Sequence, residues 1–260
     1  MIRHLIIIML LVLPYSVFAQ KWKLTRYEAS FGVGFANYFG DVGGTPEVNN
    51  WYGIRDYSIT GTRPSIIGDV RYKVLQNVAI KLHLGFIMLG GSDAGSKNAT
   101  RGLDGKGFSF NTIGLEHTIQ GEYAFLAEER RVKSYAMFNR QGMLNNYSRI
   151  SMYVFGGVGG LGFKPFFNGK PDDWDIPSTG FNYALVFPLG IGAKYIIDNT
   201  SAINIEFGGR YILGDNVDGI LPGPSNHSNN FNDIYYFASA SYIYRIKTSR
   251  RGLPVLFFGY

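Results

Sequence analysis

Cysteine is absent from this 260-residue chain, and charged side chains make up only 17% of it. Without cysteine there can be no disulfide framework and no lipid-modified N-terminal cysteine. A disulfide-free exported protein of this size is nevertheless ordinary for a bacterial envelope. Beyond residue 20 the chain also lacks any stretch that is long and apolar enough to span a membrane as a helix.

The first twenty residues, MIRHLIIIMLLVLPYSVFAQ, have the three parts of a secretory signal peptide. Arg3 and His4 form a polar start, Leu5 to Leu13 form an apolar run too short to span a bilayer, and Ala19 is a small residue suited to signal peptidase. We therefore expect residues 1–19 to be a signal peptide and residues 20–260 to form the mature domain.

Aromatic residues make up 16% of the chain, and 34 residues are glycine, which is typical of many strands with aromatic girdles. The net charge of +6 and the isoelectric point near 9.3 could indicate a nucleic-acid partner. The positive charge is dispersed, however, apart from small clusters near 129–133 and 245–251. This dispersion favours solvated charge at a membrane surface, and we expect no nucleic-acid partner.

The clearest strand pattern is a hairpin at 181–214 with a polar turn at 198–201. Apolar residues such as Leu185, Phe187 and Leu189 alternate with smaller or polar ones, and the second half continues the alternation. Since successive side chains of a strand point to opposite faces, each strand has an apolar face and a polar, charged face. A soluble sandwich or a lipid-facing barrel could use this pattern.

The same alternation recurs often enough to predict about eight strands. Tight turns are expected at 75–77 and 198–201, whereas most other connections are long and rich in Gly, Pro and Asn. An even number of strands, a signal peptide and many Tyr and Phe favour the membrane barrel over the sandwich. We predict an all-β fold, an eight-stranded antiparallel transmembrane β-barrel with long extracellular loops. The expected strands are 27–39, 64–74, 78–89, 110–125, 181–197, 202–214, 234–247 and the glycine-rich 151–163, whose faces the pattern does not assign. The expected long loops are 41–61, 90–107, 164–180 and 215–231.

The predicted barrel interior carries charges of both signs in nearly equal number. A narrow barrel is filled by side chains, and isolated buried charges are too costly, so these residues should form a hydrogen-bonded ionic network. The predicted lumen network consists of Glu28, Asp69, Arg71, Lys73, Lys81, Glu116, Glu122, Lys194, Glu206, Arg210 and Arg245.

Catalytic and metal-binding patterns are weak. Ser109 and His117 share a strand face but lie about 26 Å apart at strand spacing, too far for a nucleophile and its base. The histidines show no metal-ligand spacing, so we expect no metal, no cofactor and no enzymatic activity. The GGVGG run at 156–160 lacks the Lys-Ser/Thr of a phosphate-binding loop, and its glycines fit curvature and close packing in a tight barrel.

Two segments do not fit a minimal barrel. The connection 127–147 is long and charged where a short periplasmic turn is expected, and the tail 248–260 ends in apolar residues. A solvated turn is one reading of the connection; a periplasmic docking surface is the other, because unusually long connections are often functional. The residues expected to carry docking are Glu128, Glu129, Arg130, Arg131, Lys133, Arg250 and Arg251.

The segments SRISMYVFGGVGGLGF at 148–163 and YALVFPLGIGAKYIIDNTSAINIEFGGRYIL at 183–213 resemble a Bacteroidetes outer-membrane β-barrel family that includes PorG of the type IX secretion system. Tyr38 to Asp41 also resembles that family's N-terminal YxGD segment. The resemblance implies a bacterial outer-membrane barrel that anchors periplasmic PorK–PorN-type ring subunits of the secretion and gliding machinery. It implies no catalytic residues.

Two functions are therefore expected from the sequence. The first is a non-enzymatic barrel in the outer-membrane lipid that docks periplasmic ring components. The alternative is a surface adhesin or small-ligand binder that acts through its outer loops, where Trp51, Tyr52 and Trp174 lie.

Overall fold

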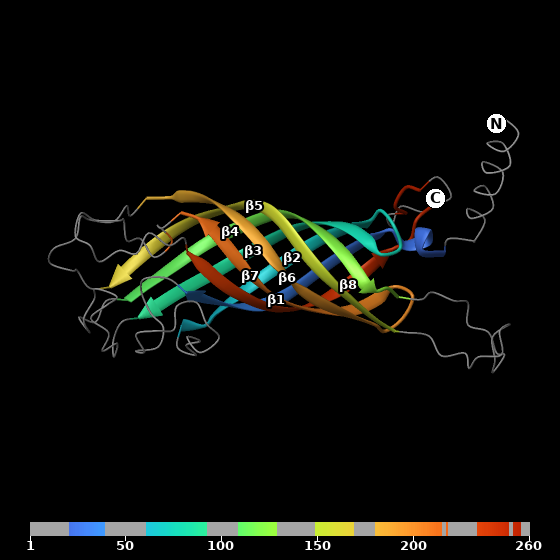
Figure 1. Cartoon of the computed structure of the whole chain (residues 1–260), viewed down its shortest axis with the longest axis horizontal. Coiled ribbons are helices and arrows are strands. Elements are labelled where there is room, and N and C mark those ends of the chain that lie inside the picture. The colour runs from blue at the N-terminus through green and yellow to red at the C-terminus, as the bar shows by residue number, and fades with distance from the viewer. Residues whose placement is uncertain are drawn as a thin grey trace, which may run out of the picture.

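The computed structural model describes residues 21–39, 61–92, 109–128, 149–168, 180–214, 217, 233–249 and 252–255. Eight antiparallel strands form one closed sheet, because β1 pairs with β2 on one side and with β8 on the other. Figure 1 shows them as tilted ribbons wound round a common axis. The predicted eight-stranded antiparallel barrel is confirmed. The strands are β1 Tyr27–Phe39, β2 Arg63–Lys73, β3 Val78–Ser92, β4 Ser109–Leu126, β5 Ile150–Asn168, β6 Asn182–Ile196, β7 Ser201–Leu213 and β8 Ile234–Ile246.

Alternation along each strand sets which side chains face the interior. In β6, Leu185, Phe187 and Leu189 are exposed on the outside, whereas Val186 is fully buried and Lys194 is buried on the inside. This is the period-two pattern expected of a strand with two different environments. The barrel therefore has an apolar exterior and an interior that contains most of its charges.

The two ends of the barrel differ. The 3₁₀ helix η2 (Lys21–Thr25), the tight turns at 74–77 and 197–200 and the chain after β8 all lie at one end, which we call the termini end (Figure 1). The four connections 40–62, 93–108, 169–181 and 214–233 start and finish at the other end. Among the described residues, no helix combines the length and the apolarity needed to cross a membrane.

The chain after β8 turns back on itself as a small hairpin. Thr248 bridges Pro254, and the amide of Val255 donates to the carbonyl of Lys247. The amide of Thr248 also donates to the carbonyl of Leu24, which ties the hairpin to η2. The described part of the tail is therefore a projection beside the barrel rim and not a further strand of the wall.

Strand β5 is the glycine-rich strand whose faces the sequence pattern did not assign. Tyr153 and Phe155 point into the lumen, and Val154 and Val158 point outward. Gly157 and Gly159, on the same face as Tyr153 and Phe155, allow the backbone of β4 to approach β5 closely. A Cβ on Gly159 would lie 2.0 Å from the carbonyl oxygen of His117, a separation that side chains do not tolerate.

Replacing Gly159 by Ala should consequently lower the free energy of unfolding by about 1 to 3 kcal/mol, because the backbone of β4 or β5 must move. The matched control is Gly121→Ala, whose Cβ would meet nothing nearer than the Gly156 carbonyl oxygen at 3.9 Å. Denaturant titration of both variants, followed by heat-modifiable gel mobility, measures the difference. Equal stability of the two variants would contradict this role for Gly159.

Strands β3 and β5 extend beyond their predicted ends. Strand β3 continues to Ser92, and β5 continues to Asn168 through residues that we expected to be loop. The prolines near 165 favoured a loop, but beyond Phe163 the strand pairs only with β4. Proline is tolerated at such an edge because one side of the strand needs no amide donor.

Several predicted features lie outside the described residues. They are the signal peptide 1–19, the aromatic residues Trp51, Tyr52 and Trp174, most of the connection 127–147, and the tail residues Arg250, Arg251 and 256–260.

Candidate functional site

The outer surface of the barrel is a continuous apolar belt. Leu189 is 71% exposed and Phe31 is 65% exposed, and large apolar side chains of all eight strands behave alike. Tyrosines Tyr27, Tyr123 and Tyr195 lie near the strand ends that form the termini end, as in the aromatic girdle at a membrane interface. A closed barrel leaves no sheet edge unpaired, so this surface can be covered by lipid without cost to the backbone. The barrel is built to span a bilayer.

The lumen has two parts. The half nearest the four long connections is filled by a buried apolar cluster that includes Tyr38, Phe110, Phe163 and Phe237. Val217, from the connection between β7 and β8, is fully buried in the same cluster. Its carbonyl accepts a 2.7 Å hydrogen bond from Thr112 Oγ1, and its amide donates to Asp233. This half is closed by side chains.

The half nearest the termini end holds an ionic network centred on Glu28. Its carboxylate is 3.1 Å from Arg71 Nη1, 2.9 Å from Lys73 Nζ and 2.6 Å from Lys194 Nζ. Arg245 Nε lies 3.4 Å away. Four cations from three strands, β2, β6 and β8, thus share one buried carboxylate, which offsets the cost of removing these charges from water.

A second set of contacts runs across the lumen from β2 to β7. Arg71 Nη2 donates to Glu122 at 2.9 Å, and Lys81 Nζ donates to Glu206 at 2.6 Å. The hydroxyl of Tyr153 donates to Glu206 at 2.6 Å and accepts from Arg71 at 3.2 Å. Through Tyr153 the two ion pairs become one connected network, so these strands are fixed in their register.

In the middle of the barrel His83 lies between two carboxylates. His83 Nδ1 is 2.5 Å from Asp69, and Nε2 is 3.8 Å from Glu116. Ser30 Oγ donates to the same Asp69 at 2.8 Å. Ser30 is hydrogen-bonded to Asp69 and not to His83. The imidazole therefore cannot take the proton of the serine hydroxyl, which activation of a serine nucleophile requires.

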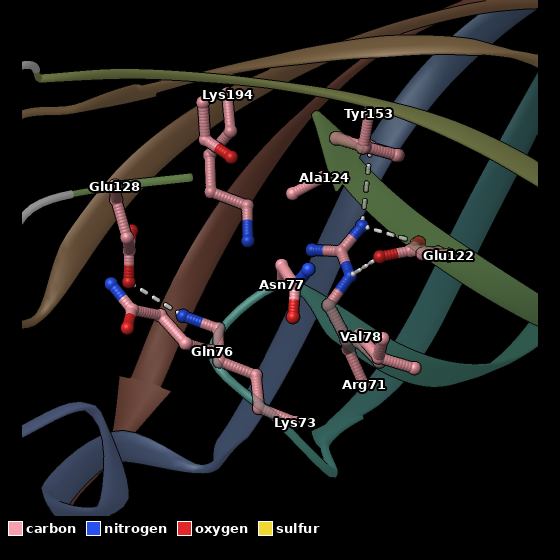
Figure 2. A pocket seen from close by; sticks show the side chains of 12 residues that line it. Arg71, Lys73, Gln76, Asn77, Val78, Glu122, Ala124, Glu128, Tyr153 and Lys194 are labelled. Atoms are coloured by element: carbon pink, nitrogen blue, oxygen red, sulfur yellow. Dashed lines mark hydrogen bonds and ion pairs between the residues drawn. The ribbon is translucent and has the colours of Figure 1, made fainter. Parts of the chain in front are cut away.

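The network opens to solvent at the termini end through a hollow, which we call the mouth. Figure 2 shows Arg71, Lys73 and Lys194 pointing into it, with Glu122 beside Arg71 and Glu128 beside Lys73. Its rim includes Gln76 and Asn77 from the β2–β3 turn. The mouth is therefore a polar, mainly cationic recess at the end that carries the tight turns.

Every residue of the predicted lumen network is buried inside the barrel, and each forms an ion pair with another member or, for Asp69, with His83. The structure adds residues that the alternation did not identify. Tyr153 was missed because its strand had no assigned faces, and Tyr235 because it stands beside the outward-facing Tyr236. The tyrosine Tyr235 donates to Glu116 at 2.5 Å, and Arg210 lies against Phe155 and Phe237.

Glu128 is placed differently from our expectation. We assigned it to an exposed docking surface, but it is 7% exposed and enters the mouth. Lys73 Nζ donates to it at 2.6 Å, and Arg245 donates to its other oxygen. The ion pairs with Lys73 and Arg245 offset the free energy of hydration that the Glu128 carboxylate loses on burial. The other predicted docking residues lie outside the described residues: Glu129, Arg130, Arg131, Lys133, Arg250 and Arg251.

Glu128 should make the stability of the barrel depend on pH. Burial raises the pKa of its carboxyl, but the charges of Lys73, Arg245 and Lys194 outweigh this and lower the pKa from 4.5 to about 2. Because the folded-state pKa is depressed, the contribution is complete above pH 4.5 and is lost as the pH falls towards 2. We expect a loss of about 3 kcal/mol over this window.

The measurement is the free energy of unfolding of the native protein and of Glu128→Gln at pH 6, 4 and 2.5. The difference between the two proteins should shrink as the pH falls, since the other carboxylates are common to both. A difference that stays constant down to pH 2.5 would contradict the assignment.

His117 is the histidine of the outer face, and it pairs with Tyr183. The Tyr183 hydroxyl is 3.0 Å from His117 Nε2, and the tyrosine ring covers Gly160, which leaves room for it. Among the described residues, no group of three or more His, Cys, Asp or Glu could hold a metal ion. His117 is thus hydrogen-bonded to Tyr183 of β6, whose ring crosses β5 at Gly160.

No protein-family model matches the chain, and neither does any curated protein. The barrel is similar to solved outer-membrane structures. Neisserial surface protein A has a TM-score of 0.44 at 11% identity, over 85% of this chain and 97% of that chain. The N-terminal barrel of Pseudomonas aeruginosa OprF has a TM-score of 0.41 at 11% identity, over 84% and 98%. Outer membrane protein W of E. coli has a TM-score of 0.40 at 13% identity, over 85% and 97%. These similarities concern the fold alone.

Proposed function

We propose that this protein is a non-enzymatic barrel of the bacterial outer membrane that anchors a periplasmic protein assembly at its termini end. In such barrels the short turns face the periplasm and the longer loops face outside. The tight turns at 74–77 and 197–200 therefore assign the termini end to the periplasm. The signal peptide expected at 1–19 supports export to this location.

One observation carries the anchoring role: in the described part of the chain, the segments outside the barrel wall, apart from Val217, gather at the periplasmic end. These are η2, the hairpin of residues 247–255 and the start of the β4–β5 connection, which Glu128 holds in the mouth. The lumen itself is occupied by paired charges and by the apolar cluster. A filled barrel offers its ends, and not a channel, for function.

The resemblance to the PorG-containing family suggests which assembly is anchored. We propose that PorK–PorN-type ring subunits of the type IX secretion and gliding machinery dock at the periplasmic end. The residues proposed for this contact are Glu129, Arg130, Arg131 and Lys133 of the β4–β5 connection, with Arg250 and Arg251 of the tail.

The test replaces 129–148 by a short Gly-Ser turn that leaves Glu128 in place. Affinity purification from the native outer membrane should then recover at least tenfold less of the periplasmic ring subunits, with heat-modifiable mobility unchanged. The matched control replaces 218–232, at the opposite end of the barrel, and should leave recovery intact. Undiminished recovery after removal of 129–148 would reject the docking role.

A second function is a surface adhesin or small-ligand binder. It is favoured by one observation, that the four longest connections apart from 129–148 all leave the barrel at the outer end. In that case replacement of 218–232 and its neighbours abolishes cell-surface binding, while secretion and ring recovery stay unchanged.

A further inference from the structure

The mouth binds a carboxylate that no strand supplies. Glu128 follows the last residue of β4 by two positions, yet its side chain turns back into the barrel. Lys73 Nζ lies 2.6 Å from its Oε1, and Arg245 Nη2 donates to Oε2. The charged partners thus come from β2 and β8: Lys73 lines the mouth, and Arg245 is fully buried. Lys73 and Arg245 therefore form a binding site for a carboxylate, and Glu128 occupies this site.

Without Glu128 the mouth would hold an excess of positive charge. Arg71, Lys73, Lys194 and Arg245 would then share Glu28 and Glu122. Even with Glu128 in place, Nε and Nη1 of the fully buried Arg245 donate no hydrogen bond to any described residue. A buried guanidinium carries five donors, and unsatisfied donors are costly, so the mouth has capacity for another acceptor.

The rim around the mouth has the same sign. Among the described residues, Lys23, Arg149 and Lys247 are exposed at the termini end, where Asp198 of the 197–200 turn is the one exposed carboxylate. Segregating acids to the interior leaves a basic collar at the periplasmic face. A basic collar raises the local concentration of acidic groups and speeds their association.

We propose that the mouth is a carboxylate-binding site that Glu128 occupies within the chain, and that an acidic side chain of a periplasmic protein takes its place on docking. Displacement of Glu128 frees the β4–β5 connection from Lys73 and Arg245 at the moment the partner arrives. The identity of the partner rests on the proposed function, whereas the existence of the site does not.

The experiment uses the full mature chain in bilayers of zwitterionic lipid and a fluorescent tetraglutamate peptide as the probe. Anisotropy measures its affinity for the native protein, Glu128→Gln and the double variant Glu128→Gln/Lys73→Met. Glu128→Gln should bind the peptide at least tenfold more tightly than the native protein, and the added Lys73→Met should remove the gain. A tetralysine peptide should bind none of the three.

A second variant, Glu128→Asp, keeps the charge and withdraws the carboxylate by one methylene, so it tests the site even if Glu128→Gln fails to fold. Its affinity for tetraglutamate should exceed that of the native protein. Equal affinities in all variants would overturn the proposal, as would stronger competition by glycerol phosphate than by glutarate, which would make the site a phosphate site. Ring recovery plays no part here, so failure of this test and failure of the docking role are distinguishable.

Discussion

Replacing Glu28 by Gln should lower the free energy of unfolding by about 3 to 5 kcal/mol, because it leaves buried cations without their carboxylate. Glu28 is 1% exposed and is the shared partner of Arg71, Lys73 and Lys194. The glutamine keeps the shape of the side chain and one acceptor but not the charge. The loss therefore reports on charge and not on packing.

A double-mutant cycle with Lys194→Met isolates one pair of this cluster. Since Lys194 is 2.6 Å from Glu28, the double variant should be more stable than the sum of the two single losses implies. Ser241→Ala, a buried lumen substitution that removes no charge, is the control and should change stability far less. If Glu28→Gln costs no more than this control, the network does not stabilise the barrel.

Replacing Leu189 by Arg should cost about 2 to 4 kcal/mol in a lipid bilayer, the penalty for a charge at the midplane of a barrel's outer face. Leu189 is 71% exposed and stands midway along β6 between the outward-facing Tyr183 and Tyr195. In water the same substitution would be close to neutral, since an exposed Arg pays no desolvation.

The matched control is Tyr195→Arg, at a girdle tyrosine that is the second-last residue of β6. Near the interface the penalty falls to about 0 to 1 kcal/mol, so the two variants should differ clearly. Denaturant titration of the barrel refolded into vesicles measures both. Equal penalties at the two positions would argue against a lipid-covered belt.

The sequence predicted the fold well where alternation was unbroken. In β6 the order Leu185, Phe187, Leu189 against Lys194 assigns both faces, and in β3 the order Ile80, Leu82, Leu84 against Lys81 and His83 does the same. One face of each strand contacts lipid and the other faces a filled, polar lumen. Each of these strands therefore alternates apolar with polar or small side chains. Seven such strands, together with the glycine-rich eighth, were enough to indicate a closed barrel.

The two faces of β5 could not be predicted, because its glycines interrupt the alternation of large apolar and polar side chains. Glycines Gly156, Gly157 and Gly159 hide the phase of β5, so the lumen roles of Tyr153 and Phe155 could not be assigned. Gly157 and Gly159 are needed because the backbone of β4 approaches β5 closely there, a three-dimensional cause that a single sequence does not reveal.

Glu128 was misplaced for a different reason. It lies just after β4, in a charged stretch whose local composition favours a solvated turn. Its partners Lys73 and Arg245 are distant in sequence and meet it only because the barrel closes β1 against β8. Long-range electrostatic contacts of this kind follow from the closed topology and not from local spacing.

The central claim is that lipid covers the outer face of this barrel, and spin-label accessibility in vesicles tests it most directly. The chain has no cysteine, so Ala240→Cys on the outer face of β8 and Thr200→Cys in the tight turn at the termini end can each be labelled alone. We predict that the label at 240 collides mainly with oxygen, which dissolves in lipid, and the label at 200 mainly with a water-soluble nickel chelate. Equal access of the nickel chelate to both positions would contradict the account.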